Sequence, residues 1–377
     1  MLSEHRGLFS AGCALNGRGE CILLGILCVL ANTIHAQDTK QTSVGSEIDV
    51  VVQQQIKAYN IPGLSVAAVQ HGQIVFSKSY GWADLESRVL VTDDTLFRIG
   101  SITKSITATA ALMMAERHQL DLNTPVQRYC PSYSDKQWPV TTRQLLAHMG
   151  GVRGFHSEGG VSSELLSDSH YVRVTDSLPL FANDPLTAKP GTHYEYSNYG
   201  YDLIGCALEG ASGLRFDELV RKLILTPAGM TATTLDDSLM IIPRRSRYYT
   251  HAKDGTIRNA KSIDTSNRIP AAGLLSTAND LARFVLAVES GRLLSANSIH
   301  LMWTEQTTTE GEPNGYALGW MIRQLKDTSV IAHTGEQPGS SAILCIFPRS
   351  QAAYVVLANT DAAGLWKWAN QIAELIQ

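Results

Sequence analysis

Three short motifs bring together residue types that could cleave an ester or an amide. The first is Ser101-Ile102-Thr103-Lys104, in which a spacing of three on a helix places the hydroxyl and the amine on the same face. A serine hydroxyl is a poor nucleophile until a neighbouring group takes its proton. If Lys104 lies in the first turn of a buried helix, desolvation lowers its pKa towards a value at which it can accept that proton. Because a serine and a lysine also stand three apart by chance, this motif is weak by itself.

The second motif is Tyr196-Ser197-Asn198. A tyrosine close to two cations can hold its phenolate at a pH well below its usual pKa of about 10, and can then act as a base and later as an acid. The amide of Asn198 could donate a hydrogen bond to a substrate carbonyl. The alternative interpretation is a packing loop, because further tyrosines crowd the same stretch: Tyr194, Tyr199 and Tyr201.

The third motif, His333-Thr334-Gly335, ends an apolar strand that we predict over residues 329–333. A strand edge can offer main-chain N–H groups to a substrate, and Gly335 allows the close approach that this requires. The alternative is a strand that simply ends in a turn. Each motif by itself is unpersuasive, so the hypothesis depends on all three.

The sequence around these motifs predicts a central helix and a sheet. Residues 101–118 would be apolar on nearly all sides of a helix, which is typical of a helix at the centre of a protein. Apolar runs bounded by turn residues predict a hairpin over residues 63–82 and strands near the C-terminus. We therefore expect an α/β (α+β) fold, with an antiparallel sheet built from both chain ends and flanked by helices. Near the C-terminus we predict strands at residues 329–333, 341–347 and 352–357, followed by a final helix at residues 362–376.

The middle of the chain predicts a mostly helical lobe inserted on that sheet. Amphipathic segments such as residues 200–209 and 215–225 alternate with loops that contain proline and glycine. We expect one domain over residues 37–377, divided into an α/β lobe from about 47–119 and 264–377 and a helical lobe at about 120–263.

The N-terminus predicts an export signal over residues 1–36. Residues 22–31 are almost continuously apolar, Arg6 and Arg18 precede them, and small residues follow. The run is shorter than the roughly 20 apolar residues that a membrane-spanning helix needs. We therefore expect an exported protein, periplasmic or secreted, with no stable membrane span once the signal is cleaved. The alternatives are an uncleaved anchor or a misassigned start.

The composition indicates an ordinary globular protein with a small-molecule or peptide substrate. The chain is 44% hydrophobic and 18% charged, with a net charge of −4, and its basic residues are scattered, so a nucleic-acid partner is disfavoured. No HExxH or comparable ligand spacing supports a metal enzyme. Beyond the signal the cysteines are Cys130, Cys206 and Cys345, without a CxxC spacing. We expect three buried thiols, while one bridge and one free thiol is the alternative.

The three motifs, in this order, resemble those of the penicillin-binding proteins and serine β-lactamases. The Tyr-x-Asn form is similar to class C β-lactamases and their relatives among esterases, D-aminopeptidases and carboxypeptidases. Within this group the chain resembles the mitochondrial β-lactamase-like branch of animals and its bacterial relatives, from about residue 62 to residue 359. The other family-like segments are Phe97-Arg98-Ile99-Gly100, residues 145–151, residues 273–281 and Leu318-Gly319-Trp320.

The resemblance implies a β-lactamase/transpeptidase-like fold and a role for each motif. Ser101 would be the nucleophile, and Lys104 and Tyr196 would transfer protons. The main-chain N–H groups of Ser101 and Glu336 would form the oxyanion hole. The resemblance implies no metal and no organic cofactor, and substrates such as a β-lactam, an ester or a D-amino-acid peptide. The predicted substrate-binding residues are Asn198, His333, Thr334, Gly335 and Glu336.

Two departures from the family pattern bear on the substrate. True β-lactamases of this type usually have lysine where this chain has His333, and histidine is largely neutral at pH 7 unless a neighbour holds its proton. We therefore expect weaker carboxylate recognition; if His333 did hold a carboxylate, activity on acidic substrates would fall as the pH rises through its pKa. Glu336 stands where relatives have a small residue, and alternation along a strand leaves the direction of its side chain open.

A second class of function stays open beside the serine hydrolase. A chain can keep this fold as a non-catalytic binding or self-assembling protein. The joint presence of Ser101, Lys104 and Tyr196 favours catalysis. The sequence leaves the oligomeric state undetermined.

Overall fold

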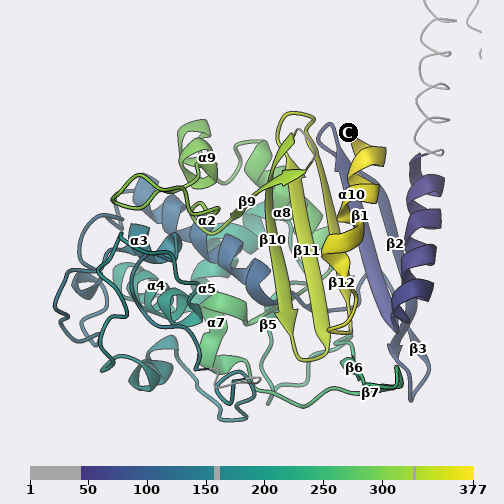
Figure 1. Cartoon of the computed structure of the whole chain (residues 1–377), viewed down its shortest axis with the longest axis horizontal. Helices are drawn as coiled ribbons and strands as arrows, with labels where there is room; N and C mark the ends of the chain where they lie inside the picture. Colours follow the sequence, from purple (N-terminus) through teal and green to yellow (C-terminus); the bar gives the residue numbers. More distant parts are fainter. Residues whose placement is uncertain (1–43, 157–161, 326–327) are drawn as a thin grey trace, which may run out of the picture. The chain divides into compact units, whose positions relative to one another are not determined.

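A seven-stranded antiparallel sheet joins the two ends of the chain in a computed structural model that describes residues 44–156, 162–325 and 328–377 (Figure 1). The N-terminal hairpin pairs with the C-terminal strands through β1 and β12, where Val66 lies opposite Val356. This confirms the predicted sheet. Its strands, in spatial order, are β3 (Val89–Leu90), β2 (Gln73–Asp84), β1 (Gly63–Gln70), β12 (Ala352–Ala358), β11 (Ser340–Phe347), β10 (Thr328–Gln337) and β9 (Met321–Leu325).

Helices cover both faces of this sheet, which explains the continuous apolar sequence of its central strands. Helix α8 (Ala278–Glu289) packs on β1 and β12 from one side, and α10 (Leu365–Ile376) packs on β11 and β12 from the other (Figure 1). All residues of β11 and β12 are buried. Alternate side chains of a strand point to opposite faces, so a strand covered on both faces needs apolar residues at successive positions.

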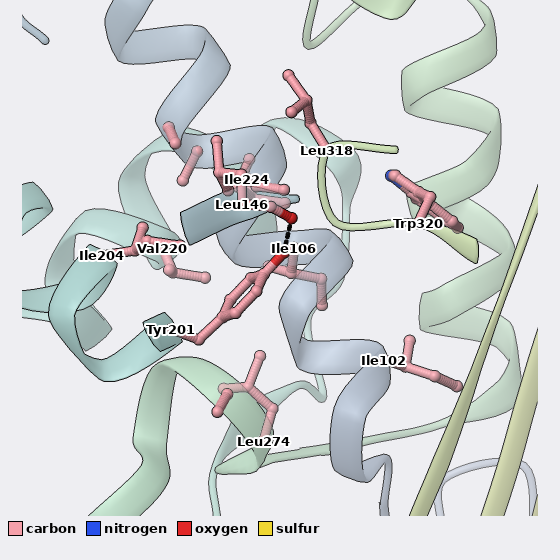
Figure 2. Packing of buried hydrophobic residues seen from close by; sticks show 14 of the residues in the cluster. Ile102, Ile106, Leu146, Tyr201, Ile204, Val220, Ile224, Leu274, Leu318 and Trp320 are labelled. Carbon is pink, nitrogen blue, oxygen red and sulfur yellow. Dashed lines mark hydrogen bonds between the residues drawn. The ribbon is translucent and has the colours of Figure 1, made fainter. Parts of the chain in front are cut away.

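The central helix begins at the first of the three sequence motifs, residues 101–104. A short 3₁₀ turn, η1 (Gly100–Ile102), leads into α2 (Thr103–Glu116), whose residues are buried from Thr103 to Met114. Ile102 and Ile106 belong to one buried apolar cluster with side chains from α4, α5 and the segment before β9 (Figure 2). The prediction of a helix buried on all sides is confirmed, and it places Ser101 where the chain enters the core.

The middle of the chain forms mainly short helices, together with a few short strands. Residues 47–377 form one unit, so the proposed division into two lobes stays a prediction. The helices of this region are η2 (Val126–Arg128), α3 (Thr142–Leu146), η3 (Val174–Leu180), α4 (Asn198–Ser212), α5 (Phe216–Val220), η4 (Arg221–Leu225) and α6 (Thr226–Ala228). The strands are β5 (Thr234–Leu235), β6 (Tyr249–His251) and β7 (Ile257–Asn259).

Two further segments complete the surroundings of the site. Strand β4 (Phe97–Arg98) pairs with β8 (Leu274–Ser276), which also pairs with β5. The chain before β8 forms η5 (Ser266–Arg268) and α7 (Ile269–Ala272), which packs on α2 and α4. The remaining helices are residues 44–59 and α9 (Ala296–Trp303).

A disulfide joins Cys130 to Cys206, and Cys345 is a buried free thiol. The expectation of three thiols is therefore wrong, and the alternative of one bridge and one free thiol is confirmed. The fold brings Cys130, beside η2, against helix α4, although 76 positions separate the two cysteines along the chain. Spacing could not indicate this pairing because it depends on how the helices pack.

Loss of this disulfide is expected to lower the free energy of unfolding by about 2–4 kcal/mol, because the cross-link restricts the unfolded chain. Urea denaturation of the oxidised protein and of the double variant Cys130→Ala/Cys206→Ala measures the difference. Cys345→Ala is the matched control, since it removes a thiol without opening a loop. Equal midpoints for the oxidised protein and the double variant would contradict the prediction.

The predicted export signal, residues 1–36, lies outside the described residues and stays a prediction. Within the described ranges, the structure contains no helix of the length and apolarity required to cross a membrane.

Candidate active site

The first motif forms a direct contact between its hydroxyl and its amine. Lys104 Nζ lies 3.0 Å from Ser101 Oγ, as the spacing on a helix predicts. The same nitrogen donates to Asn198 Oδ1 at 2.7 Å and to the main-chain oxygen of Ala271 at 3.0 Å. The Lys104 side chain, which comes from α2, is thus fixed by hydrogen bonds to residues of α4 and α7.

This geometry suits a neutral amine that accepts a proton. The oxygens of Asn198 and Ala271 can only accept hydrogen bonds, so they use two N–H groups of Lys104. A neutral amine has only two N–H groups. When both donate to these oxygens, the lone pair of the nitrogen is left to accept a hydrogen bond from the Ser101 hydroxyl. Complete burial lowers the pKa of Lys104 well below its usual value, which favours the neutral form. The arrangement can therefore remove the proton of Ser101.

Tyr196 meets the same hydroxyl from the loop that precedes α4. A hydrogen bond links its side chain to Ser101, and Lys104 Nζ lies 4.8 Å from the centre of its ring. The Ser197 hydroxyl caps α4 by accepting from the main-chain N–H of Gly200 at 2.9 Å, which fixes where the loop ends. The structure therefore brings together the predicted nucleophile, Ser101, and the two residues predicted to transfer protons, Lys104 and Tyr196.

The expectation of a low pKa for Tyr196 is wrong. Burial raises the pKa of its phenol above the usual value, although the hydrogen bond between Tyr196 and Ser101 acts in the opposite direction. Two cations would have been needed to stabilise a phenolate, but burial lowers the pKa of both Lys104 and His333. Tyr196 therefore keeps its proton near neutral pH and suits the role of an acid towards a leaving group.

Strand β10 passes directly beside the nucleophile. A Cβ on Gly335 would collide with the main-chain oxygen of Ile99 and lie 3.2 Å from the Ser101 nitrogen, so only glycine permits this approach. Gly100 has a positive φ of 49°, and a Cβ there would lie 2.9 Å from the Glu336 nitrogen. The main-chain N–H groups predicted for the oxyanion hole therefore lie next to each other.

No strand in the described part of the chain pairs with this edge of β10 beside Ser101. Among the described residues, β9 pairs with β10 only over Thr328–Ala332, while β10 continues to Gln337. The strand expected to end near His333 therefore extends further and presents its final residues to η1. An unpaired strand edge can offer main-chain hydrogen bonds to a bound substrate.

Comparison with known proteins identifies the family to which this chain belongs. A family model described as Beta-lactamase matches residues 48–371, most of the chain. The chain belongs to this family. Serine beta-lactamase-like protein LACTB of Mus musculus, a mitochondrial protein, is 27% identical over 384 residues, which cover 76% of this chain and 69% of LACTB.

Solved structures show the β-lactamase/transpeptidase-like fold for this family member. D-amino acid amidase from Ochrobactrum anthropi SV3 superposes with a TM-score of 0.75 at 23% identity, over 89% of this chain and 98% of the amidase. EstCE1, described as a hydrolase with promiscuous acyltransferase activity, superposes with a TM-score of 0.72 at 21% identity, over 89% of this chain and 99% of that chain.

His333, the departure from the lysine of the β-lactamase family, is completely buried. Its Nδ1 lies 2.7 Å from the main-chain oxygen of Thr334, which can only accept, so Nδ1 carries the proton. Nε2 then accepts a hydrogen bond from the Tyr316 hydroxyl at 2.8 Å. Burial is the main cause that lowers the pKa of His333 to about 3, and a proton on Lys104 would act in the same direction. The ring is therefore neutral near pH 7, and no neighbour supplies the proton that carboxylate binding would need.

The pH dependence of activity is therefore expected to be the same for acidic and neutral esters between about pH 5 and 8, the range in which an ordinary histidine titrates. His333 gains its proton only as the pH falls towards its pKa of about 3. Parallel profiles of kcat/KM measure this, with His333→Gln as the comparison. A fall near pH 6.5 for the acidic ester alone, absent in His333→Gln, would contradict it.

Thr334 and Glu336 lie on the opposite face of β10 from His333. His333 pairs with Leu344, which packs in the core shared with α2, and alternation turns its neighbours to the other side. Glu336 is exposed and Thr334 is partly buried. The question left open by the sequence is thus answered: the Glu336 carboxylate points away from the face that holds His333. The main chain of Gly335 and Glu336 lies beside Gly100 and Ser101, and substrate contacts by the side chains of Thr334 and Glu336 stay predictions.

Sequence reasoning missed the aromatic support behind Tyr196. The ring of His148 packs on Tyr196 with 4.2 Å between centres and on Tyr316 with 4.7 Å, and its Nδ1 accepts from the Ser197 main chain at 3.1 Å. A chain of contacts thus runs from His333 to Tyr196. His148 lies within the family-like segment at residues 145–151, and Tyr316 lies two positions before the segment at residues 318–320. This proximity was the sequence signal that could have indicated them. Within the part of the chain that the structure describes, no cluster of three or more potential metal ligands occurs.

Proposed function

We propose that this chain is a serine hydrolase that cleaves an ester or an amide through an acyl-enzyme on Ser101. The observation that carries the proposal is the hydrogen bonding of Lys104, whose amine meets two obligate acceptors and the Ser101 hydroxyl at 3.0 Å. A buried, neutral amine in this position is a general base for the adjacent hydroxyl.

Acylation then follows from the positions of the groups. Lys104 takes the proton of Ser101 as its Oγ bonds to the carbonyl carbon, and the N–H groups of Ser101 and Glu336 stabilise the oxygen that becomes negative. The bond to the leaving group breaks, and the leaving group takes a proton from Tyr196, which regains one from Lys104. In the second half, water attacks the acyl-enzyme and gives a proton to Tyr196 while Tyr196 passes its own proton to the neutral Lys104. Lys104 then returns this proton to Ser101 Oγ as the bond between Oγ and the acyl group breaks.

An uncharged or basic substrate fits the site better than an anionic one. His333 is neutral, so the site lacks the cation with which β-lactamases of this type hold a carboxylate. The amidase and EstCE1 superpose over almost their whole length, which supports amides and esters as the substrate class. We propose short esters or D-amino-acid amides and peptides ahead of β-lactams.

We also propose that the protein works in an oxidising compartment. The Cys130–Cys206 disulfide supports this, because disulfides persist in exported proteins and are rare in the cytosol. This agrees with the predicted export signal. Mass spectrometry of the N-terminus of the secreted protein would test it.

A direct comparison of substrates tests the reaction. An aryl ester, a D-amino-acid anilide and a chromogenic cephalosporin are assayed side by side, and a fluorophosphonate probe is used to trap the nucleophile. We expect turnover of the ester and the anilide to exceed that of the cephalosporin, and an adduct on Ser101. Folded protein that forms no adduct and turns over none of the three would favour the non-catalytic binding function instead.

A further inference from the structure

A polar cavity lies outside the group of residues assigned to catalysis. Its volume is about 440 Å³, and it is lined by Arg98, Ser238, residues 245–248 and residues 259–263. None of the residues predicted to bind substrate or to transfer protons lines it. A volume of this size is typical of a site for a small ligand. We call it the basic cavity.

The lining of the basic cavity is rich in hydrogen-bond donors and contains no carboxylate. Of its eleven residues, all but Ala260 and Ile263 have a side chain that can donate. Four of them are cations: Arg98, Arg245, Arg247 and Lys261. Cations that line one space favour an anion in it, and the guanidinium of arginine matches the oxygens of a carboxylate or a phosphate.

One buried carboxylate serves the two inner arginines. Arg98 Nε donates to Asp236 Oδ2 at 2.6 Å, and Arg245 Nη1 lies 3.7 Å from Asp236 Oδ1. Arg245 Nε is buried and has no hydrogen-bond partner among the described residues. A buried donor without a partner is costly, so this nitrogen favours an additional acceptor. The two guanidiniums thus keep an excess of positive charge beside the cavity.

The two outer cations have no strong partner. Lys261 Nζ donates to the main-chain oxygen of Leu166 at 3.2 Å. In the part of the chain that the structure describes, this amine forms no salt bridge. Arg247 Nε lies 3.7 Å from Asp84 Oδ2, and 64% of the Arg247 side chain is exposed, so this pair contributes little. Both cations can therefore bind an anion in the cavity.

Two further acids lie near the lining, but they hold other partners. Asp264 accepts from the Ser238 hydroxyl and lies 2.8 Å from His170 Nδ1. Glu86 accepts from Asn259 Nδ2 at 2.7 Å. Neither acid lines the cavity. Because both accept from uncharged lining side chains, they do not neutralise the four cations by direct contact.

We propose that the basic cavity binds the phosphate group of a small polar molecule or of a lipid. The oxygens of an ionised phosphate accept hydrogen bonds, which matches a lining of donors, and its negative charge offsets the excess of positive charge. The inference does not depend on the proposed function, because no residue assigned to the acyl-enzyme reaction lines the cavity.

An exposed apolar loop adjoins the basic cavity. Leu239, Met240 and Ile241 are 72%, 61% and 95% exposed, and they stand between Ser238 and Arg245 of the lining. Arg245 donates to the main-chain oxygen of Met240 at 3.2 Å, which holds the loop next to the cavity. Exposed apolar side chains beside basic residues are typical of surfaces that bind anionic membranes. A phospholipid headgroup and a soluble phosphate compound are thus two sources of the same chemical group.

Calorimetric titration of the full chain with inorganic phosphate and with glycerol phosphate, at constant ionic strength, tests the inference. We expect saturable binding of one equivalent. The double variant Arg247→Gln/Lys261→Gln should lower the association constant by about tenfold or more, because each cation contributes a charge-assisted hydrogen bond. Both side chains are exposed, so this variant should fold as the wild type does.

Vesicles of phosphatidylcholine with and without phosphatidylglycerol distinguish the two sources. Sedimentation with the anionic vesicles only, lost in the double variant, would support the inference with a lipid headgroup as the ligand. Binding of the soluble phosphates without sedimentation would support it with a small molecule as the ligand.

Arg258→Gln is the matched control, since it removes an exposed cation of β7 that does not line the cavity, and it should leave binding unchanged. Ser101→Ala should also bind phosphate as the wild type does. The inference would be overturned if neither the soluble phosphates nor the anionic vesicles bound, or if the double variant bound as tightly as Arg258→Gln. Loss of binding in Ser101→Ala would place the anion at the catalytic residues instead and would also overturn it.

Discussion

Replacement of Ser101 by alanine is expected to abolish covalent labelling and to lower kcat/KM for an aryl ester by about 10⁴-fold or more. The reason is the loss of Ser101 Oγ, which lies 3.0 Å from the Lys104 amine and is its only hydroxyl partner among the described residues. The other partners of this amine are an amide oxygen and a main-chain carbonyl, neither of which is a nucleophile. Labelling with a fluorophosphonate followed by peptide mass spectrometry measures the first effect, and ester hydrolysis measures the second.

Ser105→Ala is the matched control for this experiment. Ser105 lies one turn further along α2, is completely buried, and donates its hydroxyl to the main-chain oxygen of Gly319 at 2.8 Å. Its replacement should cost about 1 kcal/mol of stability through one lost hydrogen bond, with labelling retained. An adduct that persists in Ser101→Ala would show that another residue is the nucleophile.

Replacement of Lys104 by methionine is expected to lower kcat by about 10²- to 10⁴-fold, the usual contribution of a general base. Methionine has a similar length and tolerates an apolar core, so the helix should still fold. The oxygens of Asn198 and Ala271 lose their donor, which should lower stability by about 1–3 kcal/mol. Steady-state kinetics with the aryl ester and thermal unfolding separate the two effects.

Lys136→Met provides the comparison for Lys104→Met. Lys136 is partly buried and also donates to main-chain oxygens, those of Ala182 and, at 2.8 Å, Asp184. Its loss should therefore affect stability through the same kind of contact while kcat is unchanged. If Lys104→Met retained more than about a tenth of wild-type kcat, the base would have to be another group.

The fold could be predicted because the patterns of apolar residues that specify its strands and its central helix extend over many residues. Apolar runs of strand length at both ends of the chain correctly predict a single antiparallel sheet, and the apolar stretch after Ser101 correctly predicts α2. The extension of β10 to Gln337 was not predictable, since its last residues are polar and are stabilised by pairing with β11. The disulfide between Cys130 and Cys206 was not predictable either, because the two cysteines meet only when the helices pack.

Part of the candidate site could also be predicted from the sequence, and part of it could not. The contact between Ser101 and Lys104 follows from helix geometry, because a spacing of three fixes which side chains share a face. The supporting residues are different: His148 and Tyr316 come from separate segments and have no spacing that relates them to Tyr196 or His333. Their importance depends on burial beside the site, which only the packed molecule defines.

The sequence by itself determined the sheet built from both chain ends, the buried helix after Ser101 and the contact between Ser101 and Lys104, because local periodicity and the geometry of one helical turn govern these features. The tertiary structure alone decided which groups carry charge. Burial keeps His333 neutral and Tyr196 protonated and weakens the basicity of Lys104. A pKa depends on the solvation and charges around a group, and here those surroundings come from residues distant along the chain.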